Sequence, residues 1–361
     1  MNLPVMPPIE PMLAKSVNTI PPGCFYEPKW DGFRAMVFRD GAEVVITSRN
    51  SRPLARYFPE VVAAVVENLP PRCVVDGEIV VANRDTGHLD FWALQQRLHP
   101  ADSRVRLLAD LTPAEFIAFD LLALDNTDLM STRFLERRRL LDEALKTARP
   151  PIHLTPMTDD STLAAQWFDS LEGAGLDGVV AKDGRDRYEP GRRIMFKIKH
   201  ERTLDCVVVG YRTHKAGAGL VGSLLLGLYA DGAGPADAWA EMFQGLVPIG
   251  VAASFPMALR SRLATELAPL VIDIADHPWH STAAEATPQT GSRWNPDKDL
   301  SFVPLKAERV AEVRYNHMDG GQLRHPAQFL RWRPDRDPSS CGFAQLESTV
   351  AVNVQDVLKG H

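Results

Sequence analysis

The spacing of apolar residues divides the chain into two regions with different predicted structures. Up to about residue 200, short runs rich in Val, Ile and Phe alternate with stretches in which apolar residues recur at helical spacing. The runs predict strands at 33–39, 43–48, 73–81, 116–122, 177–182 and 195–199. Helices are predicted at 58–69, 133–139 and 162–173. Asp40-Gly41 is a turn signal, so the first two strands are expected to form a hairpin.

Beyond residue 205 the chain reads as short strands separated by glycine and proline. The strands are expected at 206–211, 223–229, 239–243 and 310–315. A helix is expected around 254–267, with Ser254 as its N-cap and Pro256 in its first turn, and a polar loop at 276–299 follows. This pattern is typical of a small barrel with one inserted helix, and an OB fold is the expected type. The whole chain is therefore predicted to be α+β, with domains at 1–200 and 201–361.

Composition adds limits to this picture. The chain has 361 residues, of which 45% are hydrophobic and 24% charged, with a formal net charge of −6. Any nucleic-acid-binding surface must therefore be local, because the overall charge is acidic. The four cysteines show no disulfide or metal-ligand spacing and indicate reduced thiols of a cytoplasmic protein. No apolar run approaches the ~18 residues of a membrane span, and no signal peptide is predicted.

A single lysine stands out in the stretch 26–34, YEPKWDGFR. Pro28 restricts Glu27 to extended conformations, and Asp31-Gly32 is a turn signal. Lys29 is therefore predicted to lie at a strand-to-turn edge. A lysine nucleophile must be neutral, which at pH 7 costs roughly 4–5 kcal/mol unless nearby cations or burial reduce that cost. Taken alone, the stretch also fits an ordinary surface lysine beside a hairpin.

Further residues carry candidate chemistry. Lys197 and Lys199 are two apart on a predicted strand, so both side chains leave one face, where they can bind phosphates or protect a solvated edge. Glu78 lies in a strand otherwise made of valine and isoleucine, and Asp177 begins another. Together these acids can hold one divalent cation through oxygen ligands, although Glu78 also fits a strand-end turn. Phe119 can stack a base or belong to the core.

Residues 217–222 (GAGLVG) match G-x-G-x-x-G. A dinucleotide-binding fingerprint must follow a strand and begin a helix. Here 223–229 continues as a predicted strand, so the match is interpreted as a glycine-rich hairpin.

In their order along the chain, these signals resemble the motifs of the covalent nucleotidyltransferases, specifically ATP-dependent DNA ligases. The matching segments are 29–34 (KWDGFR), 75–78 (VDGE), 119–122 (FDLL), 177–182 (DGVVAK), 197–199 (KIK) and 331–336 (RWRPDR). Segments 9–14 (IEPMLA) and 329–335 (FLRWRPD) look closest to the compact bacterial ligase C group. The resemblance implies a nucleotidyltransferase domain followed by an OB-fold domain.

The resemblance also implies roles for individual residues. Lys29 is the implied site of AMP attachment, Phe119 packs on adenine, and Glu27 helps to read the base. Glu78 contacts ribose or metal, and Asp177 contacts metal. The other residues implied to bind the nucleotide are Arg34, Arg49, Lys182, Lys197, Lys199, Arg331 and Arg333.

The implied activity is sealing of 5′-phosphate/3′-hydroxyl nicks in double-stranded DNA by a monomer that takes part in DNA repair. ATP and Mg²⁺ are the implied cofactors, with Mn²⁺ able to substitute. Fewer than thirty residues precede Lys29, which favours ATP over NAD because no NMN-recognition module fits there. The sixth motif lies on the barrel, so a hinge is expected near 200–204, and DNA contacts are expected at 133–139 and 185–193.

Two departures from the family pattern affect these expectations. Asp177 replaces the usual glutamate and is one methylene shorter, and Arg336 replaces the usual lysine. Both are expected to change rates more than reaction type. Two alternatives remain: another enzyme of the superfamily, such as an RNA ligase or an RNA-capping guanylyltransferase, and a non-catalytic OB-fold adaptor. The preferred nucleotide and the ability to form any protein–nucleotide adduct distinguish them.

Overall fold

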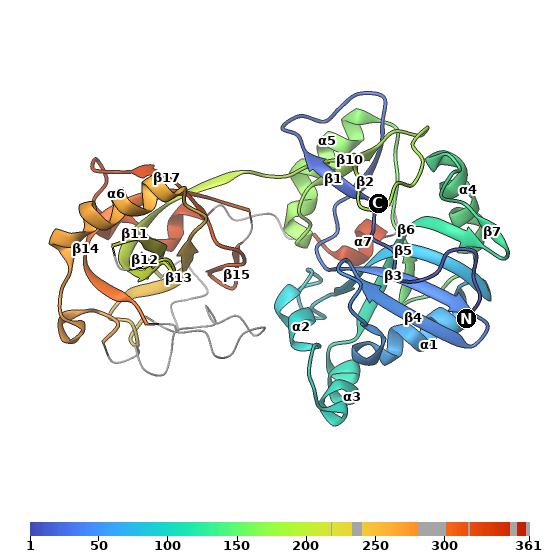
Figure 1. Cartoon of the computed structure of the whole chain (residues 1–361), viewed down its shortest axis with the longest axis horizontal. Helices are drawn as coiled ribbons and strands as arrows, with labels where there is room; N and C mark the ends of the chain where they lie inside the picture. The colour runs from blue at the N-terminus through green and yellow to red at the C-terminus, as the bar shows by residue number, and fades with distance from the viewer. Residues whose placement is uncertain (218, 233–239, 281–300, 317, 347–351, 359–361) are drawn as a thin grey trace. The chain divides into compact units, whose positions relative to one another are not determined.

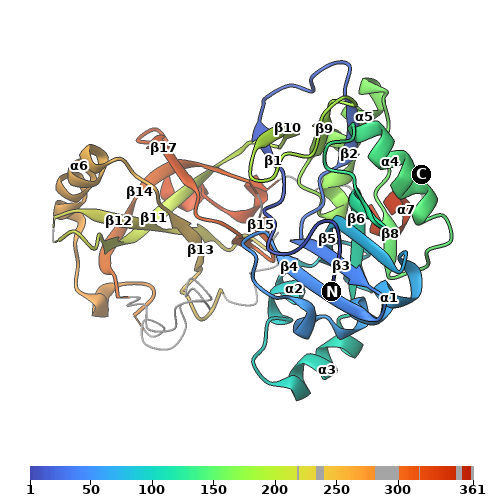
Figure 2. The ribbon, with the colours of Figure 1, turned by 45° about the vertical axis from the view of Figure 1, so that its right-hand side comes forward.

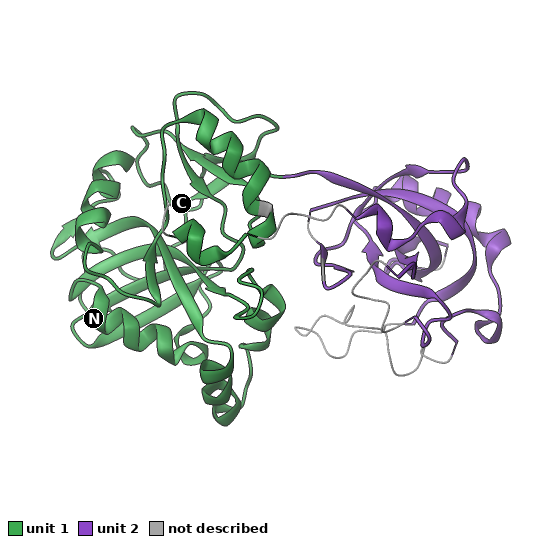
Figure 3. Cartoon of the chain, turned by 180° about the vertical axis from the view of Figure 1, so that it is seen from behind, with its two compact units in different colours: residues 1–199, 349–361 green, residues 200–348 purple. Residues whose placement is uncertain are grey.

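The computed structural model describes the chain except for residues 218, 233–239, 281–300, 317, 347–351 and 359–361. The chain divides into two compact units (Figure 3): unit 1 comprises residues 1–199 with 349–361, and unit 2 comprises residues 200–348. The predicted division assigned everything after residue 200 to the second domain. The C-terminal residues instead belong to unit 1, for a reason given below.

Unit 1 contains two sheets. The larger has the order β4-β3-β5-β6-β7, with β8 paired to β6. Its strands are β3 (Phe33–Asp40), β4 (Glu43–Ser48), β5 (Arg72–Val81), β6 (Ala114–Leu124), β7 (Thr127–Asp128) and β8 (Ile152–Leu154). The smaller has the order β1-β10-β9-β2. Its strands are β1 (Leu13–Ser16), β2 (Phe25–Pro28), β9 (Val179–Lys182) and β10 (Arg193–Ile198).

Both faces of the larger sheet are buried. Neighbouring residues of β3 point to opposite faces, so Ala35 packs with the buried side of α1 while Met36 packs with Leu3 and Met12 of the N-terminal segment. The helices described in unit 1 are α1 (Pro59–Asn68), α2 (Phe91–Gln96), α3 (Asp102–Leu111), α4 (Phe134–Ala144), α5 (Ser161–Ser170) and α7 (Val354–Leu358). Figure 2 shows α4 alongside β6, which is the strand it packs against.

Unit 2 is a five-stranded barrel of the predicted OB type, with strands in the order β13-β12-β11-β14-β17. The strands are β11 (Arg202–Thr213), β12 (Val221–Tyr229), β13 (Leu246–Ala252), β14 (Val303–Tyr315) and β17 (Gln328–Trp332). A parallel bridge between Ala252 and Ala327 links the two outer strands and closes the barrel. Helix α6 (Met257–Leu267) lies between β13 and β14, and a small hairpin, β15 (Met318–Asp319) with β16 (Gln322–Leu323), precedes β17. Strands β11 and β12 pair antiparallel, which confirms that the described residues of 217–222, all except 218, belong to a hairpin.

Some predicted elements of unit 2 need correction. The strand expected at 239–243 is wrong: the third barrel strand is β13, and the described residues 240–243 form turns. Helix α6 begins at Met257 with Pro256 at the N-cap position, whereas Ser254 has a φ of 64°. Most of the expected polar loop at 276–299 lies outside the described residues. In unit 1, helices α2 and α3 were not expected from the sequence.

The C-terminal helix α7 belongs to unit 1 because its apolar side chains are buried there. Val354 and Val357, one turn apart, pack into a cluster that contains Trp30, the residue after Lys29. The backbone amide of Val354 donates to the carbonyl of Gly87 at 2.8 Å. In Figure 1 this red helix lies among the elements of unit 1. The chain therefore leaves unit 1 after residue 199 and returns to it at its end.

Two further expectations concern thiols and membranes. Cys24, Cys73, Cys206 and Cys341 are all buried free thiols, as predicted. Burial raises the pKa of Cys73 to about 12, so this thiol is unreactive at neutral pH. Among the described residues, no helix combines the length and the apolar character needed to cross a membrane.

Candidate active site

Lys29 lies directly after β2, where the chain passes from the smaller sheet to the larger one. The amide of Lys29 donates to the carbonyl of Gly178 at 2.9 Å, and the amide of Asp177 donates to the carbonyl of Lys29 at 3.0 Å. Three residues on, a Cβ at Gly32 would lie 2.1 Å from the carbonyl oxygen of Ile79, so only glycine fits beside β5. The predicted strand-to-turn setting of Lys29 is confirmed: its backbone is held by the segment that leads into β9, and Gly32 holds the following turn against β5.

The Lys29 side chain belongs to a cluster of opposite charges. Its Nζ atom lies 2.8 Å from Oδ2 of Asp177, and Nζ of Lys199 lies 2.5 Å from the same oxygen. Burial alone would raise the pKa of Asp177, but Lys29 and Lys199 reverse this effect and hold that pKa below its ordinary value. The cluster therefore keeps an ionised carboxylate between two ammonium groups.

Lys197 and Lys199, which the sequence predicted to share one face, both face this cluster. Burial lowers the pKa of Lys197, and the nearby charges of Lys199, Lys29 and Arg49 lower it further. Burial and the charge of Lys29 likewise lower the pKa of Lys199, although Asp177 opposes that shift. Lys29 and Lys199 thus bind Asp177, and Lys197 and Arg49 lie near these cations, so the site gathers positive charge suited to a polyphosphate.

Glu78 approaches Lys29 from β5, where it is the cross-strand partner of Arg34 on β3. Burial raises the pKa of Glu78 to about 7, with Arg34 and Lys29 opposing the rise. Near neutral pH this carboxylate is therefore poised between its two protonation states. Its half-buried side chain and its interaction with Lys29 agree with the predicted place beside the lysine.

The two carboxylates near Lys29 can supply part of the coordination shell of a divalent cation. Glu78 and Asp177 both supply oxygen atoms, the ligand type that Mg²⁺ prefers. No group of three or more His, Cys, Asp or Glu side chains suited to a metal occurs among the described residues. The protein can therefore contribute part of an octahedral shell, and phosphate and water oxygens must complete it, which is the usual manner of Mg²⁺ binding.

Arg34 is held by an acid that the sequence did not assign to the site. Its Nε and Nη2 atoms each lie 2.6 Å from an oxygen of Asp76, and the hydroxyl of Tyr188 donates to Asp76 at 2.6 Å. Asp76 is fully buried, so this bidentate pair fixes the guanidinium. The Arg34 guanidinium then lies 4.5 Å from the ring centroid of Phe119. Asp76 thus positions a cation against the aromatic ring predicted to stack adenine.

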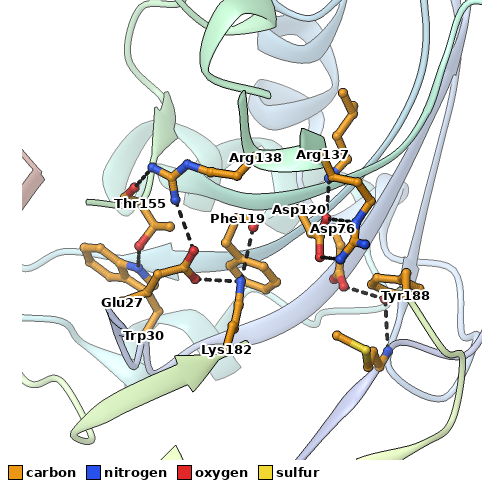
Figure 4. A network of polar contacts seen from close by, with 12 residues as sticks. Glu27, Trp30, Asp76, Phe119, Asp120, Arg137, Arg138, Thr155, Lys182 and Tyr188 are labelled. Carbon is orange, nitrogen blue, oxygen red and sulfur yellow. Dashed lines mark hydrogen bonds and ion pairs between the residues drawn. The ribbon is translucent and has the colours of Figure 1, made fainter. Parts of the chain in front are cut away.

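A second polar network surrounds the other side of Phe119 (Figure 4). Nζ of Lys182 lies 2.7 Å from Oε2 of Glu27, donates to the carbonyl oxygen of Phe119 at 3.2 Å, and is 5.0 Å from the ring centroid. Glu27, Phe119 and Lys182 are all buried. Three residues that the sequence predicted to bind the nucleotide, from three different segments, are therefore brought together beside one aromatic ring.

Arg331 and Arg333 belong to unit 2, and both rest on a pair of acids there. Asp205 on β11 and Glu312 on β14 are cross-strand partners. Nε of Arg331 lies 2.6 Å from Glu312, and Nη1 of Arg333 lies 3.0 Å from Asp205. The two opposed carboxylates would repel each other, and the ion pairs with Arg331 and Arg333 offset this repulsion. Both arginines therefore lie on one face of the barrel, as the alternation around Trp332 predicted.

Two of the four arginines at 133–139 depart from the predicted role in DNA contact, whereas Arg133 and Arg139 are exposed. In α4, Arg137 is fully buried and Arg138 is 5% exposed, so neither side chain is available to a duplex. Phe134, Arg137, Arg138 and Leu141 are the buried positions of the helix. These positions follow the i, i+3, i+4, i+7 pattern of an inward face. That spacing was the signal in the sequence that these two arginines have buried partners.

Two sheets that present a lysine among cations and carboxylates, followed by an OB barrel, define the covalent nucleotidyltransferase class. The family model for the ATP dependent DNA ligase domain matches residues 11–199, and that for the ATP dependent DNA ligase C terminal region matches residues 217–336. The chain belongs to the ATP-dependent DNA ligase family.

Similar proteins agree with this membership. DNA ligase C of Mycobacterium tuberculosis is 56% identical over 100% of this chain and 99% of its own length. DNA ligase C2 of Mycolicibacterium smegmatis is 58% identical over 96% of this chain and 97% of its own. Among solved structures, a Lig E DNA ligase covers 90% of this chain and 99% of its own, with a TM-score of 0.54 and 17% identity, and so supports the fold alone.

Proposed function

We propose that this ligase joins nicked double-stranded DNA through AMP bound covalently to Lys29. The observation that carries the proposal is the position of Nζ of Lys29, which shares the carboxylate of Asp177 with Lys199. In the first step, Nζ of Lys29 loses one proton to become a neutral amine and attacks the α-phosphorus of ATP. An N–P bond forms, the bond to pyrophosphate breaks, and the nitrogen releases a second proton to solvent. The lysine-linked AMP then passes to a 5′-phosphate, and a 3′-hydroxyl displaces AMP to seal the strand.

The cations around Lys29 bind the phosphates. Lys197, Lys199 and Arg49 lie close enough to Lys29 to act on the same group electrostatically. They stabilise the negative charge that develops as pyrophosphate leaves. Asp177 keeps two of the ammonium groups in place. Nζ of Lys29 must leave Asp177 before it can attack, and a metal ion held by Asp177 would favour that release.

Asp177 and Glu78 are the proposed metal ligands. Mg²⁺, or Mn²⁺ in its place, would supply charge neutralisation at the phosphate oxygens. Glu78 serves this role or binds the ribose only when ionised, which for a group with a pKa of about 7 requires neutral or higher pH. Asp177 meets the requirement at any pH near neutrality because its pKa is lowered by the two lysines.

The base is proposed to bind beside Phe119. Glu27 is an acceptor and Lys182 a donor, and they lie 2.7 Å apart. Adenine offers a donor, its exocyclic amine, next to an acceptor, the ring N1, whereas guanine offers the reverse order. The pair therefore supports ATP as the substrate over GTP. Arg34, fixed by Asp76 against Phe119, is proposed to hold the ribose and phosphate end.

Unit 2 is proposed to contribute Arg331 and Arg333 to the first step as a pyrophosphate clamp, and to move about a hinge near 200–204 between steps. Both arginines lie on one face of the barrel, which supports their joint use. The proposed domains are the nucleotidyltransferase domain up to residue 200 and the OB domain beyond it, with 352–358 packed on the former. We further propose that the enzyme acts as a cytoplasmic monomer in DNA repair.

Incubation with Mg²⁺ and each labelled nucleotide, followed by a denaturing gel, tests the proposal. One acid-labile adenylyl group per chain is expected from ATP, and transfer of that label to a nicked duplex is expected next. Labelling by GTP instead, or no adduct with any nucleotide, would contradict it.

A further inference from the structure

Arg138 of α4 lies outside every segment that matches a ligase motif, yet it contacts Glu27, a residue of the candidate nucleotide site. Its side chain is 5% exposed and its Nη1 atom lies 3.0 Å from Oε1 of Glu27. The other oxygen of Glu27, Oε2, is bound by Lys182 at 2.7 Å. The two cations therefore divide the two oxygens of one buried carboxylate between them (Figure 4).

Because each oxygen has its own cation, the orientation of the Glu27 carboxylate and the position of the Lys182 ammonium group are fixed. A buried carboxylate with a single cationic partner is free to rotate and engage that partner with both oxygens. Arg138 holds Oε1 and so leaves Lys182 on Oε2, beside Phe119, with its one remaining donor available. Asp142, which is half exposed, accepts from Nε of Arg138 at 2.7 Å and holds the guanidinium in turn.

A second branch of the network leads to the segment of Lys29. Nη2 of Arg138 donates to the carbonyl of Thr155 at 2.7 Å, and the hydroxyl of Thr155 accepts from Nε1 of Trp30 at 2.8 Å. Thr155 is fully buried, so loss of either bond leaves an unpaired polar group. The indole next to Lys29 is thereby connected to the same side chain that orients Glu27.

We propose that Arg138 is a positioning residue that sets the base-reading carboxylate of Glu27 and, through Thr155, the indole that adjoins Lys29. The proposal rests on the proposed function, because it assigns the base to Glu27 and Lys182. It predicts that one buried arginine determines both the affinity for ATP and the preference for ATP over GTP.

The test compares single-turnover adenylation of Arg138→Met with that of Arg97→Met. Arg97 is the matched control: it is fully buried and pairs with Glu60 at 2.6 Å, and its hydrogen-bond partners Glu60, Thr112 and Tyr57 are not candidate site residues. Both variants are expected to lower the melting temperature. Only Arg138→Met is expected to raise the KM for ATP, by roughly 10- to 100-fold for a lost charged hydrogen bond. The same variant should reduce the preference for ATP, measured as the ratio of adenylation efficiencies with ATP and with GTP.

Two further variants separate the branches and cover a failure of Arg138→Met to fold. Asp142→Asn, at a half-exposed position, should raise the KM for ATP in the same direction by a smaller factor. Thr155→Val keeps the carbonyl that Arg138 binds but removes the acceptor for Trp30, so it should lower the adenylation rate constant and leave the KM unchanged.

A double-mutant cycle tests whether Arg138 acts on ATP binding through Glu27. In a Glu27→Gln background, the added effect of Arg138→Met on the KM for ATP should shrink to within about twofold, because residues in one network are not additive. An unchanged KM in both Arg138→Met and Asp142→Asn, or full additivity with Glu27→Gln, would overturn the inference while wild-type adenylation still upheld the proposed function. Absence of any adduct in the wild type would overturn both.

Discussion

Nζ of Lys29 and Oδ2 of Asp177 lie 2.8 Å apart, although 148 positions separate them along the chain. Asp177 also binds Lys199, so the carboxylate holds the proposed nucleophile and one of the proposed phosphate-binding groups at the same time. In the proposed reaction, Nζ of Lys29 must leave this pair before it can attack the nucleotide. We therefore expect nucleotide binding and release of the nucleophile to be coupled at Asp177.

Replacement of Lys29 should abolish adduct formation. Lys29→Ala removes the atom that forms the N–P bond, and Lys199 still pairs with Asp177, so the fold is expected to survive. Lys146→Ala is the control, because that side chain is 73% exposed and its ion pair with Glu143 is long, at 4.0 Å. Labelling with ATP followed by peptide mapping gives the answer. An adduct on Lys29→Ala would assign the nucleophile elsewhere.

The charge and the length of the side chain at position 177 should have separate effects on the rate of adenylation. Asp177→Asn keeps the shape but leaves Lys29 and Lys199 without their anion, and is expected to slow adenylation by roughly 100-fold. Asp177→Glu keeps the charge and restores the ligand length usual in the family, so it should retain or raise the rate. The dependence of the rate on Mg²⁺ concentration is the second measurement. Equal rates for Asp177→Asn and the wild type would exclude a metal role for this position.

Because of Glu78, the rate of adenylation should fall on the acidic side (the acidic limb) of its pH profile, near neutral pH. Its pKa is raised to about 7 by burial, so the ionised form required for binding metal or ribose is lost as the pH falls through that value. Mg²⁺ favours the ionised carboxylate, so raising its concentration should move the limb to lower pH. Glu78→Gln should be slower and should lose this limb. A limb that persists in Glu78→Gln would belong to another group.

The same pKa shift predicts an effect on stability. The ordinary pKa of glutamate is 4.5, so between that value and about 7 the folded chain holds a proton that the unfolded chain has lost. The contribution of Glu78 to the free energy of unfolding therefore falls as the pH rises through this window. Urea unfolding of the wild type and Glu78→Gln at several pH values should show a difference that changes within the window and is constant above it.

The arginines of unit 2 should serve the first step alone. Arg331→Ala with Arg333→Ala is expected to slow adenylation of Lys29 by roughly 30- to 1,000-fold, for about 2–4 kcal/mol of lost transition-state stabilisation. Sealing of a nick that already carries 5′-AMP should be largely unaffected. Single-turnover rates on the two substrates make the comparison, with Arg314→Ala as a surface control in β14, 40% exposed.

Loss of these arginines also leaves Asp205 and Glu312 opposed without cations. Adding Asp205→Asn and Glu312→Gln removes that repulsion. If the added changes restored adenylation, the arginines would act on barrel stability and the clamp would be refuted.

The C-terminal helix should stabilise unit 1. Val354 and Val357 are 1% and 4% exposed in the cluster that contains Trp30. Replacing both with alanine is expected to lower the free energy of unfolding by about 2–4 kcal/mol, because buried methyl groups are lost and cavities remain. Val66→Ala, at a 36% exposed position, should cost less than about 1 kcal/mol. Urea unfolding followed by tryptophan fluorescence measures both, and equal losses would refute a structural role for α7.

Local patterns in the sequence determined most of the elements of unit 1 and the setting of Lys29. Turn chemistry and apolar spacing act over a few residues, which is why the hairpin of β3 and β4, helix α1 and the run of β5 could be predicted. The barrel type followed from strand count and one helix. The third barrel strand was misplaced because Trp239–Phe243 also reads as an apolar run, and tertiary pairing selected β13 instead.

Only the tertiary structure decided which charges are buried and with whom they pair. The meeting of Lys29, Asp177 and Lys199 depends on the pairing of β2, β9 and β10, neighbouring strands of one sheet that come from distant segments of the chain. The spacing of the buried positions in α4 puts Arg138 on the inward face, but only the tertiary structure shows that its partners are Glu27 and Thr155. The physical reason is that helical and strand periodicity arise from local backbone geometry, whereas burial of a charge is favourable only where the complete fold supplies its partners.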